Sequence, residues 1–518
     1  MINPDRPSYE EALAGQYRQQ FLEAMEKEKE QLRQYQVYDR IPAEDIPNNQ
    51  MIIDTKWVFE IKRCPDRTIQ KFKARKVARG FTQESDKHYD QTFAQVARPE
   101  TWKILLLLAL KEGWVMQQWD VEGAFLNAKL HHDIYVQDIQ PNGQIETWKL
   151  KKALYGLKQA GHEWSKMLKS LLEEANLRQT ICAEGCFTTT GVRLASHVDD
   201  ILITAESEDK IDNVRKSLEK TITIENRGAP EKYLGITLTI APEKITLTQE
   251  MYIESLATQY GTNRRVTTPT TTSQTCSLEK AITEEPRCNQ SQYRALVGAM
   301  LHISRYTRPD ISTVVNFLGR RVEDPSQRNM EAAKRVLQYL WSTKSERHIF
   351  RKTSTKIEPE IWVDASYGGE NSRSQTGVLV TIMGQPINWY SRRQDVVALS
   401  ITEAEYIAAC EGAKDAAWVR QILWELEQEV IIPKIRIDNE AAGKITQTSA
   451  YHRRTRHIEH RYHYVREEVQ KAHLHIIGVP GSQNLADPLT KIVPGPILTE
   501  WKQIIGIQCL ESRMIMSG

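Results

Sequence analysis

The sequence has few cysteines and no long apolar run. Its seven cysteines are scattered over 518 residues, and such an odd, dispersed set argues for reduced thiols inside a cell. The longest uninterrupted apolar run is Ile104–Leu110, far too short to span a bilayer, and the first thirty residues carry no secretory signal. The formal net charge is only +2, so a basic surface for an acidic partner has to be local.

What is present is enough for folded domains. Hydrophobic residues make up 40% and charged residues 26% of the chain, a composition that can form hydrophobic cores, and the length suits about three domains. Apolar residues recur at helical spacing over 8–36 and predict one core-facing helix there. Thr, Ser and Gln dominate 262–290, which marks a linker, and we place a further boundary near 353–358.

The stretch Leu194–Thr204 has two apolar arms around Asp199 and Asp200. The pattern predicts two short strands and a tight turn, which places both acids at a hairpin tip. Like charges about 4 Å apart repel by about 4 kcal/mol at an effective dielectric near 20. Such a pair favours a cation, and carboxylate oxygens suit Mg²⁺ or Mn²⁺. Taken alone, the stretch is better explained by an ordinary surface turn.

Two further stretches in the first half carry candidate ligands. Residues 54–79 contain nine Lys and Arg against three acids and predict a basic hairpin with its turn at 64–67. This hairpin either binds phosphates or is simply a solvated ribbon. Val115–Val121 predicts a strand ending on Asp120, and an acid there suits a metal site or, alternatively, a turn or cap.

The last third alternates strands and helices. Predicted strands end on Asp364 and Asp438, and Ser400 with Glu403 forms a capping box. That box explains Glu403 and leaves Glu405 needing another role. A basic, His-rich helix is expected over 453–463, and a last short helix is expected to contain Asp487.

Several short motifs occur together in one order. They are Lys73–Gln83, Asp120–Val121 with Ala124–Asn127, Leu154–Ala160, Val198–Asp200, Tyr233–Ile236, Thr307–Ile311, Ala398–Ser400 with Glu403–Tyr406, and Arg456–Ile458 with Arg461–His463. In this order they resemble the Pol protein of Ty1/copia-type retrotransposons, from about residue 9 to residue 492. Any one motif is weak, but the full ordered set makes coincidence very unlikely.

The resemblance implies an α+β fold: a right-hand polymerase with fingers, palm and thumb, then a connection segment and an α/β ribonuclease H-like domain. The expected bounds are 1–260 for reverse transcriptase, 261–355 for linker and connection helices, 356–492 for the ribonuclease H-like domain and 493–518 for a C-terminal tail.

The resemblance also assigns residues. Asp120, Asp199 and Asp200 would hold two Mg²⁺ or Mn²⁺ ions, an arrangement that can activate a primer 3′-hydroxyl and stabilise the leaving pyrophosphate. Lys73 and Arg75 would clamp the triphosphate of a deoxynucleoside triphosphate, Phe125 would reject a 2′-hydroxyl, and Gln159 would contact the incoming nucleotide. The primer grip would be formed by Tyr233, Leu234 and Gly235.

Four acids in the last third would form the second active site. Asp364, Glu405, Asp438 and Asp487 are expected to converge and to bind two further metal ions, because clustered carboxylates protonate unless a divalent metal neutralises them. The expected partners are an RNA template, a DNA primer and an RNA–DNA hybrid, with association to element Gag and integrase and no membrane. The expected location is cytoplasmic and particle-associated, with a nuclear stage as the alternative.

Three departures from the family pattern stand out. His197 replaces the usual Tyr before Val198, Asp133–Lys149 looks short, and Val479–Gln483 has no His. No Gag, protease or integrase segment precedes residue 9, so we expect a processed piece or a truncated copy. Two alternatives stay open: a decayed copy that only binds nucleic acid, and an integrase or transposase core in the last third.

Overall fold

A computed structural model describes residues 5–47, 50–63, 68–85, 87–139, 143–270, 284–368, 372–440 and 464–509. The predicted turn at 64–67, the predicted helix at 453–463 and part of the predicted linker lie outside these residues. The chain divides into two compact units, 1–98 with 117–228 and 99–116 with 229–518. No helix among the described residues is both long and apolar enough to cross a membrane.

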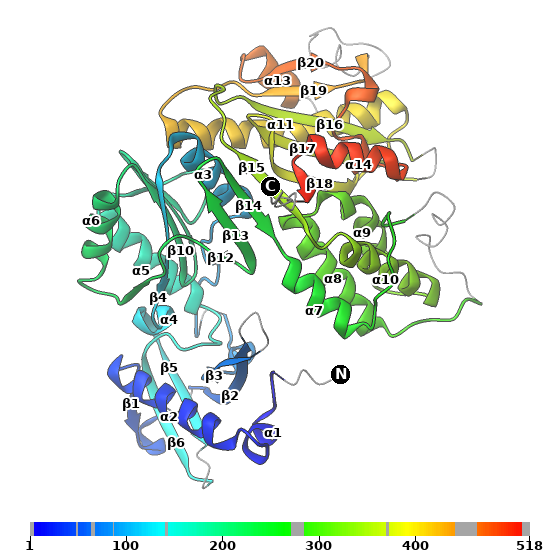
Figure 1. Cartoon of the computed structure of the whole chain (residues 1–518). Helices are drawn as coiled ribbons and strands as arrows, with labels where there is room; N and C mark the ends of the chain where they lie inside the picture. The colour runs from blue at the N-terminus through cyan, green and yellow to red at the C-terminus, as the bar shows by residue number, and fades with distance from the viewer. Residues whose placement is uncertain are drawn as a thin grey trace, which may run out of the picture. The chain divides into compact units, whose positions relative to one another are not determined.

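The first sheet of unit 1 has the order β1-β6-β5-β2-β3. Its strands are β1 (Tyr38–Ile41), β2 (Ile52–Arg63), β3 (Ile69–Ala78), β5 (Lys129–Ile139) and β6 (Ile145–Lys152). Helix α2 (Arg18–Gln34) packs on β3 (Figure 1). The prediction of one helix over 8–36 is wrong, because α1 (Tyr9–Ala14) ends at Gly15, whose extended backbone turns the chain before α2 begins.

The second sheet of unit 1 has the order β11-β4-β10-β9-β8-β7. Its strands are β4 (Val115–Val121), β7 (Arg178–Gln179), β8 (Cys186–Thr189), β9 (Val192–His197), β10 (Asp200–Ala205) and β11 (Ile224–Asn226). The short helix α4 (Ala124–Asn127) follows β4, and the amphipathic helices α5 (Ala160–Glu174) and α6 (Glu208–Leu218) contact each other. The arms on either side of Asp199 and Asp200 therefore form the predicted hairpin.

Unit 2 begins with the buried helix α3 (Pro99–Glu112) and a sheet of order β12-β13-β14-β15-β21. Its strands are β12 (Lys232–Tyr233), β13 (Ile236–Ala241), β14 (Lys244–Thr248), β15 (Glu346–Arg351) and β21 (Ile507–Cys509). Leu234 and Gly235 have φ of 50° and 80° and form a two-residue turn between β12 and β13.

The helices of unit 2 share one core with the last sheet. They are α7 (Glu250–Gln259), α8 (Gln290–Tyr306), α9 (Ser312–Gly319), α10 (Gln327–Ser342) and α14 (Gly495–Ile504). Leu379 and Trp389 of the last sheet belong to that core. Residues 493–509, expected as a tail, are ordered as α14 and β21, because Leu498 and Trp501 are buried there.

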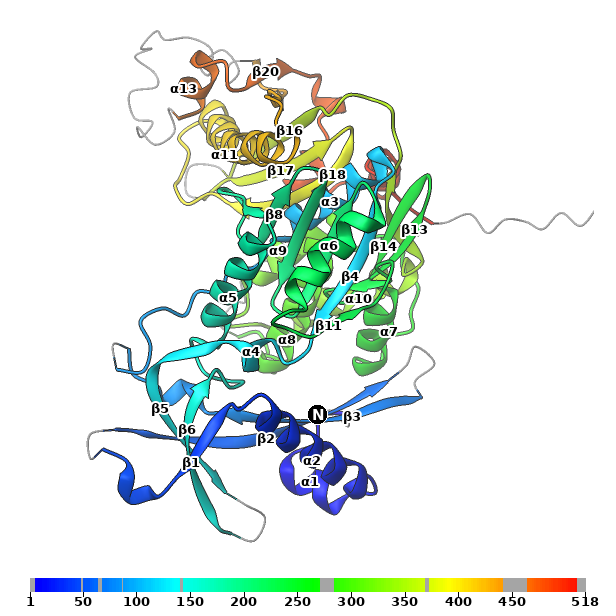
Figure 2. The same ribbon diagram turned by 90° about the vertical axis from the view of Figure 1, so that its left-hand side faces the viewer.

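The last sheet has the order β18-β17-β16-β19-β20. It contains β16 (Pro359–Ser366), β17 (Gln375–Ile382), β18 (Gln385–Arg393), β19 (Lys434–Ile437) and β20 (His475–Gly478). Strands β16, β17 and β18 are antiparallel, whereas β19 pairs in parallel with both β16 and β20. Helix α11 (Ile401–Glu427) crosses β16 (Figure 2), and α13 (Tyr464–Gln470) contacts α11.

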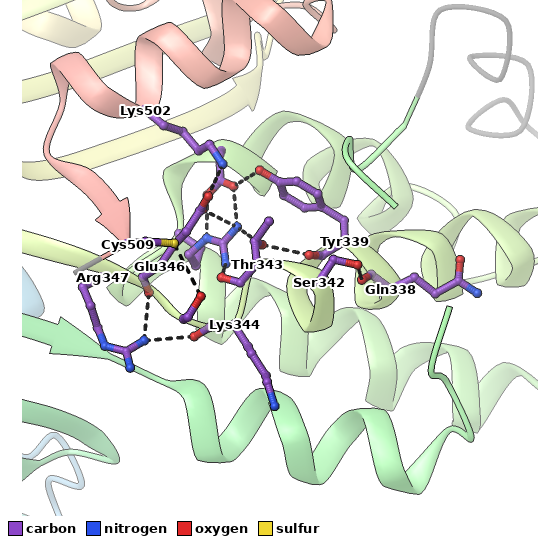
Figure 3. A network of polar contacts seen from close by, with 12 residues as sticks. Gln338, Tyr339, Ser342, Thr343, Lys344, Glu346, Arg347, Lys502 and Cys509 are labelled. Atoms are coloured by element: carbon purple, nitrogen blue, oxygen red, sulfur yellow. Dashed lines mark hydrogen bonds and ion pairs between the residues drawn. The ribbon is translucent and has the colours of Figure 1, made fainter. Parts of the chain in front are cut away.

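A buried ionic network joins helix α10 and strand β15 to helix α14. Arg308 donates two hydrogen bonds to Asp310, at 2.9 and 2.7 Å, and lies 3.3 Å from Glu346. Lys502 of α14 lies 2.6 Å from Glu346, and Tyr339 donates to Asp310 at 2.6 Å (Figure 3). Burial raises the pKa of Asp310, but the charge and hydrogen bonds of Arg308, together with Lys502 and Tyr339, outweigh burial and lower that pKa to about 2.

Candidate active sites

The first candidate site is built on the β9–β10 hairpin. His197 pairs with Asp200 in the register of the two strands, so Val198 and Asp199 form the turn. Val198 has φ of 60°, a left-handed conformation that β-branched residues rarely adopt. The indole Nε1–H of Trp164 donates to the Val198 carbonyl at 2.7 Å and helps to hold this turn.

Asp120 reaches the hairpin through the backbone of β4. The N–H of Val121 donates to the carbonyl of Asp199 at 2.9 Å, which places the end of β4 beside the turn. Gln118, two residues before Asp120, donates its side-chain amide to Oδ1 of Asp200 at 3.2 Å. The three predicted acids therefore come from adjacent strand ends.

An arginine that the sequence analysis missed lies among these acids. Nη2 of Arg227 is 2.7 Å from Oδ2 of Asp120, and Nη1 is 4.0 Å from Oδ1 of Asp200. Burial raises the pKa of Asp120, with Arg227 opposing it, and burial and the Asp199 charge raise the pKa of Asp200. No motif points to Arg227, because only folding brings it back to β4.

Two of the predicted nucleotide ligands, Arg75 and Phe125, lie against the ring of Tyr155, and the two aromatic rings meet edge to face. The guanidinium of Arg75 lies 5.2 Å from the ring centre of Tyr155, and the rings of Tyr155 and Phe125 are 5.6 Å apart. Burial, then the charges of Arg75 and Lys62, lower the pKa of Lys73 to about 8, which is the behaviour of a crowded cationic surface that an anion would stabilise.

Gly156 allows the backbone that carries Tyr155 to lie close to β3. Its φ is 88°, and a Cβ there would lie 2.2 Å from the carbonyl oxygen of Ala78. The N–H of Ala78 donates to the Tyr155 carbonyl at 2.8 Å. Any larger residue at 156 would separate β3 from Tyr155.

Two predicted ligands use their side chains inside the protein. Gln159 is buried, donates to the His88 carbonyl at 2.9 Å and accepts from Gln83 at 3.0 Å. Tyr233 is fully buried, with its ring centre 5.7 Å from that of Trp102. Leu234 and Gly235 form the adjoining turn in unit 2, so the exposed part of this hairpin is its tip rather than the tyrosine.

The second candidate site contains three of the four acids predicted in the last third. One ligand oxygen from each of Asp364, Glu405 and Asp438 lies within 4.8 Å of the others, the one such group among the described residues. Asp364 is on β16, Glu405 is near the start of α11, and Asp438 follows β19. Ser400 is the N-cap, since it accepts from the N–H of Glu403 at 3.1 Å. The Glu403 carboxylate of the predicted capping box accepts from the N–H of Leu399, at 2.8 Å, one residue before the cap.

The charge state of this cluster fits a divalent cation. Burial and the neighbouring carboxylates raise the pKa of Asp364 to about 6 and that of Glu405 to about 9. Oε2 of Glu405 is buried and has no hydrogen-bond partner among the described residues. Carboxylates that are desolvated and repel one another in this way match the donor set that Mg²⁺ or Mn²⁺ prefers.

Asp487 lies at the edge of this cluster. It begins a short 3₁₀ turn, Asp487–Leu489, and pairs with Lys491 at 2.5 Å. The same turn brings the Thr490 hydroxyl into a hydrogen bond with Asp364. Three of the four predicted acids therefore form a tight cluster. The fourth, Asp487, lies beside it in an ion pair with Lys491.

The fold and these sites define a class of protein. The chain is α+β, with a hairpin that carries two carboxylates in one sheet, followed by helices and by a mixed sheet crossed by a long helix. This is the fold class of a right-hand polymerase followed by a ribonuclease H-like domain. The family model described as reverse transcriptase (RNA-dependent DNA polymerase) matches residues 35–272.

The chain belongs to the Ty1/copia-type retrotransposon Pol family. A transposon Ty5-1 protein of Saccharomyces cerevisiae is 32% identical over 56% of this chain and 98% of its own length. The Pol polyprotein of transposon TNT 1-94 from Nicotiana tabacum is 31% identical over 98% of this chain, and the chain spans 39% of that polyprotein. A solved foamy viral protease–reverse transcriptase in complex with double-stranded DNA aligns with TM-score 0.46 and 12% identity, over 88% of this chain and 69% of the other.

Proposed function

We propose that this chain is an RNA-directed DNA polymerase that also cleaves the RNA of RNA–DNA hybrids. The observation that carries the first activity is the convergence of Asp120, Asp199 and Asp200 on two adjoining strand ends, where one guanidinium reaches both Asp120 and Asp200. Domain bounds of 1–260, 261–355 and 356–492 remain part of this proposal.

The residues of the first site would divide the work. Asp120, Asp199 and Asp200 would hold Mg²⁺ or Mn²⁺, which when bound supplies Lewis-acid activation of the primer hydroxyl and of the leaving phosphate. Lys73 and Arg75 would bind the triphosphate, and Phe125, supported by Tyr155, would lie under the sugar. Gln159 would position the 83–88 segment through its hydrogen bonds to Gln83 and to the His88 carbonyl, rather than contact the base of the incoming nucleotide directly.

In the second site Asp364, Glu405 and Asp438 would hold divalent metal, which when bound supplies an activated water for attack on an RNA phosphodiester. Asp487, held by Lys491, would complete the ligand set. The tight cluster, with Glu405 protonated at neutral pH in the absence of metal, supports this assignment.

The test measures both activities on one preparation. The parent chain should extend a DNA primer on an RNA template with deoxynucleoside triphosphates and Mg²⁺, and should cleave the RNA of the hybrid. Asp199→Asn should abolish extension and spare cleavage, whereas Asp438→Asn should do the reverse. Each variant is the folding control of the other, since each keeps one activity.

The alternative is a chain that binds nucleic acid without catalysis, for which the basic β2–β3 hairpin is the supporting feature. Hybrid binding by the parent with neither extension nor cleavage would favour it. Cleavage of duplex DNA in place of hybrid RNA would favour an integrase-like last domain. Association with Gag and integrase stays a prediction.

A further inference from the structure

The backbone around Arg227 is fixed beside the first site. Arg227 directly follows β11, its N–H donates to the Gln118 carbonyl at 2.8 Å, and the N–H of Gln118 donates to the Gly228 carbonyl at 2.8 Å. These bonds continue the β4–β11 pairing past the end of β11. The side chain therefore starts from a defined position opposite Gln118, diagonal to Asp120, which itself pairs with Glu225 in the register of the two strands.

The guanidinium contacts the acids that would bind metal. Its Nη2 lies 2.7 Å from Asp120, and its Nη1 lies 4.0 Å from Asp200. Arginine stays charged at every accessible pH. A divalent cation bound to the same carboxylates, at typical oxygen distances of about 2.0–2.6 Å, would meet this fixed positive charge and be repelled by it.

A second acceptor is within reach. Nη2 of Arg227 is 3.7 Å from Oε2 of Glu225, whose side chain is 70% exposed, whereas the side chain of Arg227 is 42% exposed. Residues two apart on an extended strand point to the same face. The guanidinium can thus leave Asp120 and remain paired with Glu225 by a side-chain rotation, without backbone movement.

We propose that Arg227 is a displaceable counter-cation of the polymerase site. It pairs with Asp120 and Asp200 when no divalent metal is bound, and it moves to Glu225 when metal enters. This exchange sets the metal concentration at which the site fills. The inference rests on the proposed function, because it takes these acids as metal ligands.

The test is a Mn²⁺ titration followed by electron paramagnetic resonance. All chains carry Asp364→Asn and Glu405→Gln, so that the second cluster does not contribute. Arg227→Gln should bind Mn²⁺ about tenfold more tightly than the parent, within the range usual for coupled sites. Arg227→Lys, which keeps the charge, should stay close to the parent. Arg33→Gln is the matched control, since Arg33 pairs with Glu26 and Glu30 on the exposed side of α2, and it should leave affinity unchanged.

Melting temperature gives an independent readout. Without metal, Arg227→Gln should melt at a lower temperature than the parent, because the acids lose their counter-charge, and Mn²⁺ should raise its melting temperature by more than it raises that of the parent. Equal or weaker Mn²⁺ binding by Arg227→Gln overturns the inference.

One further variant separates this failure from that of the proposed function. Asp199→Asn in the same background should remove Mn²⁺ binding. If it does so while Arg227→Gln binds like the parent, only the role of Arg227 is wrong. If Asp199→Asn binds Mn²⁺ as the parent does, the acids are not the ligands, and both proposals fail.

Discussion

The indole of Trp164 donates a hydrogen bond to the carbonyl of Val198 at 2.7 Å, so helix α5 holds the turn that carries Asp199. Val198 has φ of 60°, a conformation that costs a side chain with a branched Cβ about 1–2 kcal/mol. A rigid helix thus helps to keep a strained turn at the point where the candidate metal ligands lie.

Removing that one hydrogen bond should reduce primer extension more than it reduces the stability of the fold. Trp164→Phe keeps most of the packing and loses the donor, so we expect the free energy of unfolding to fall by about 1–2 kcal/mol and primer extension to slow about tenfold or more. Urea unfolding and single-turnover extension measure the two effects. If Trp164→Phe is destabilised by this amount but extends the primer at the rate of the parent, the turn does not need this hydrogen bond.

The sequence predicts this hairpin well because its signal is local. Apolar β-branched arms and two adjacent acids specify strands and a turn within eleven residues, Leu194–Thr204, and the Ser400 cap likewise depends on residues three apart. The prediction of a single helix over 8–36 is wrong because the local pattern is ambiguous at one point. A glycine inside a periodic pattern does not show whether the helix continues or ends.

The contacts that sequence reasoning missed depend on distant residues. Arg227 reaches Asp120 across β11 and β4, Gln159 is bonded to residues from the 83–88 segment, and Tyr233 is buried against Trp102. The family pattern names Gln159 and Tyr233 as ligands, but only the folded chain shows that both use their side chains inside the protein.

His197 is the departure with the most direct test. The family pattern has Tyr at this position, and the structure pairs His197 with Asp200 in the β9–β10 register. His197→Tyr should raise the rate of primer extension, because the phenol is expected to support the primer terminus, and no metal ligand changes. Steady-state extension on a primed RNA template measures this, and a rate equal to that of the parent would contradict it.

The buried Arg308–Asp310 pair should be strongly coupled to stability. Arg308→Leu leaves Asp310 charged and buried, so the free energy of unfolding should fall by about 3–5 kcal/mol. Arg287→Leu removes a surface pair with Asp324, at 2.6 Å, and should cost less than about 1 kcal/mol. Denaturant unfolding compares the two, and equal losses would contradict a special role for the buried network.

The acids of the second site should make stability depend on pH when metal is absent. The pKa of Glu405 rises from 4.5 to about 9 on folding, so the folded state binds more protons than the unfolded state between these values. Stability should therefore fall as pH rises from 4.5 toward 9, by up to about 1.4 kcal/mol per pH unit for this group.

Glu405→Gln should remove most of that slope, and Mg²⁺ should flatten it in the parent. Melting temperatures across pH 5–9, in chelator and in about 10 mM Mg²⁺ (a concentration chosen to saturate a typical site), measure both. A slope that survives Glu405→Gln unchanged would assign the pH dependence to other groups.

The central claim is that Asp120, Asp199 and Asp200 form a metal-dependent polymerase site. Its most direct measurement is Mg²⁺-dependent extension of a DNA primer on an RNA template by the parent and by Asp120→Asn. We expect extension by the parent and none in chelator. The variant should lose about a thousandfold or more of the rate, because a ligand that stabilises transition-state charge is removed, and should still cleave the RNA of the hybrid. Extension by Asp120→Asn at the rate of the parent would contradict it.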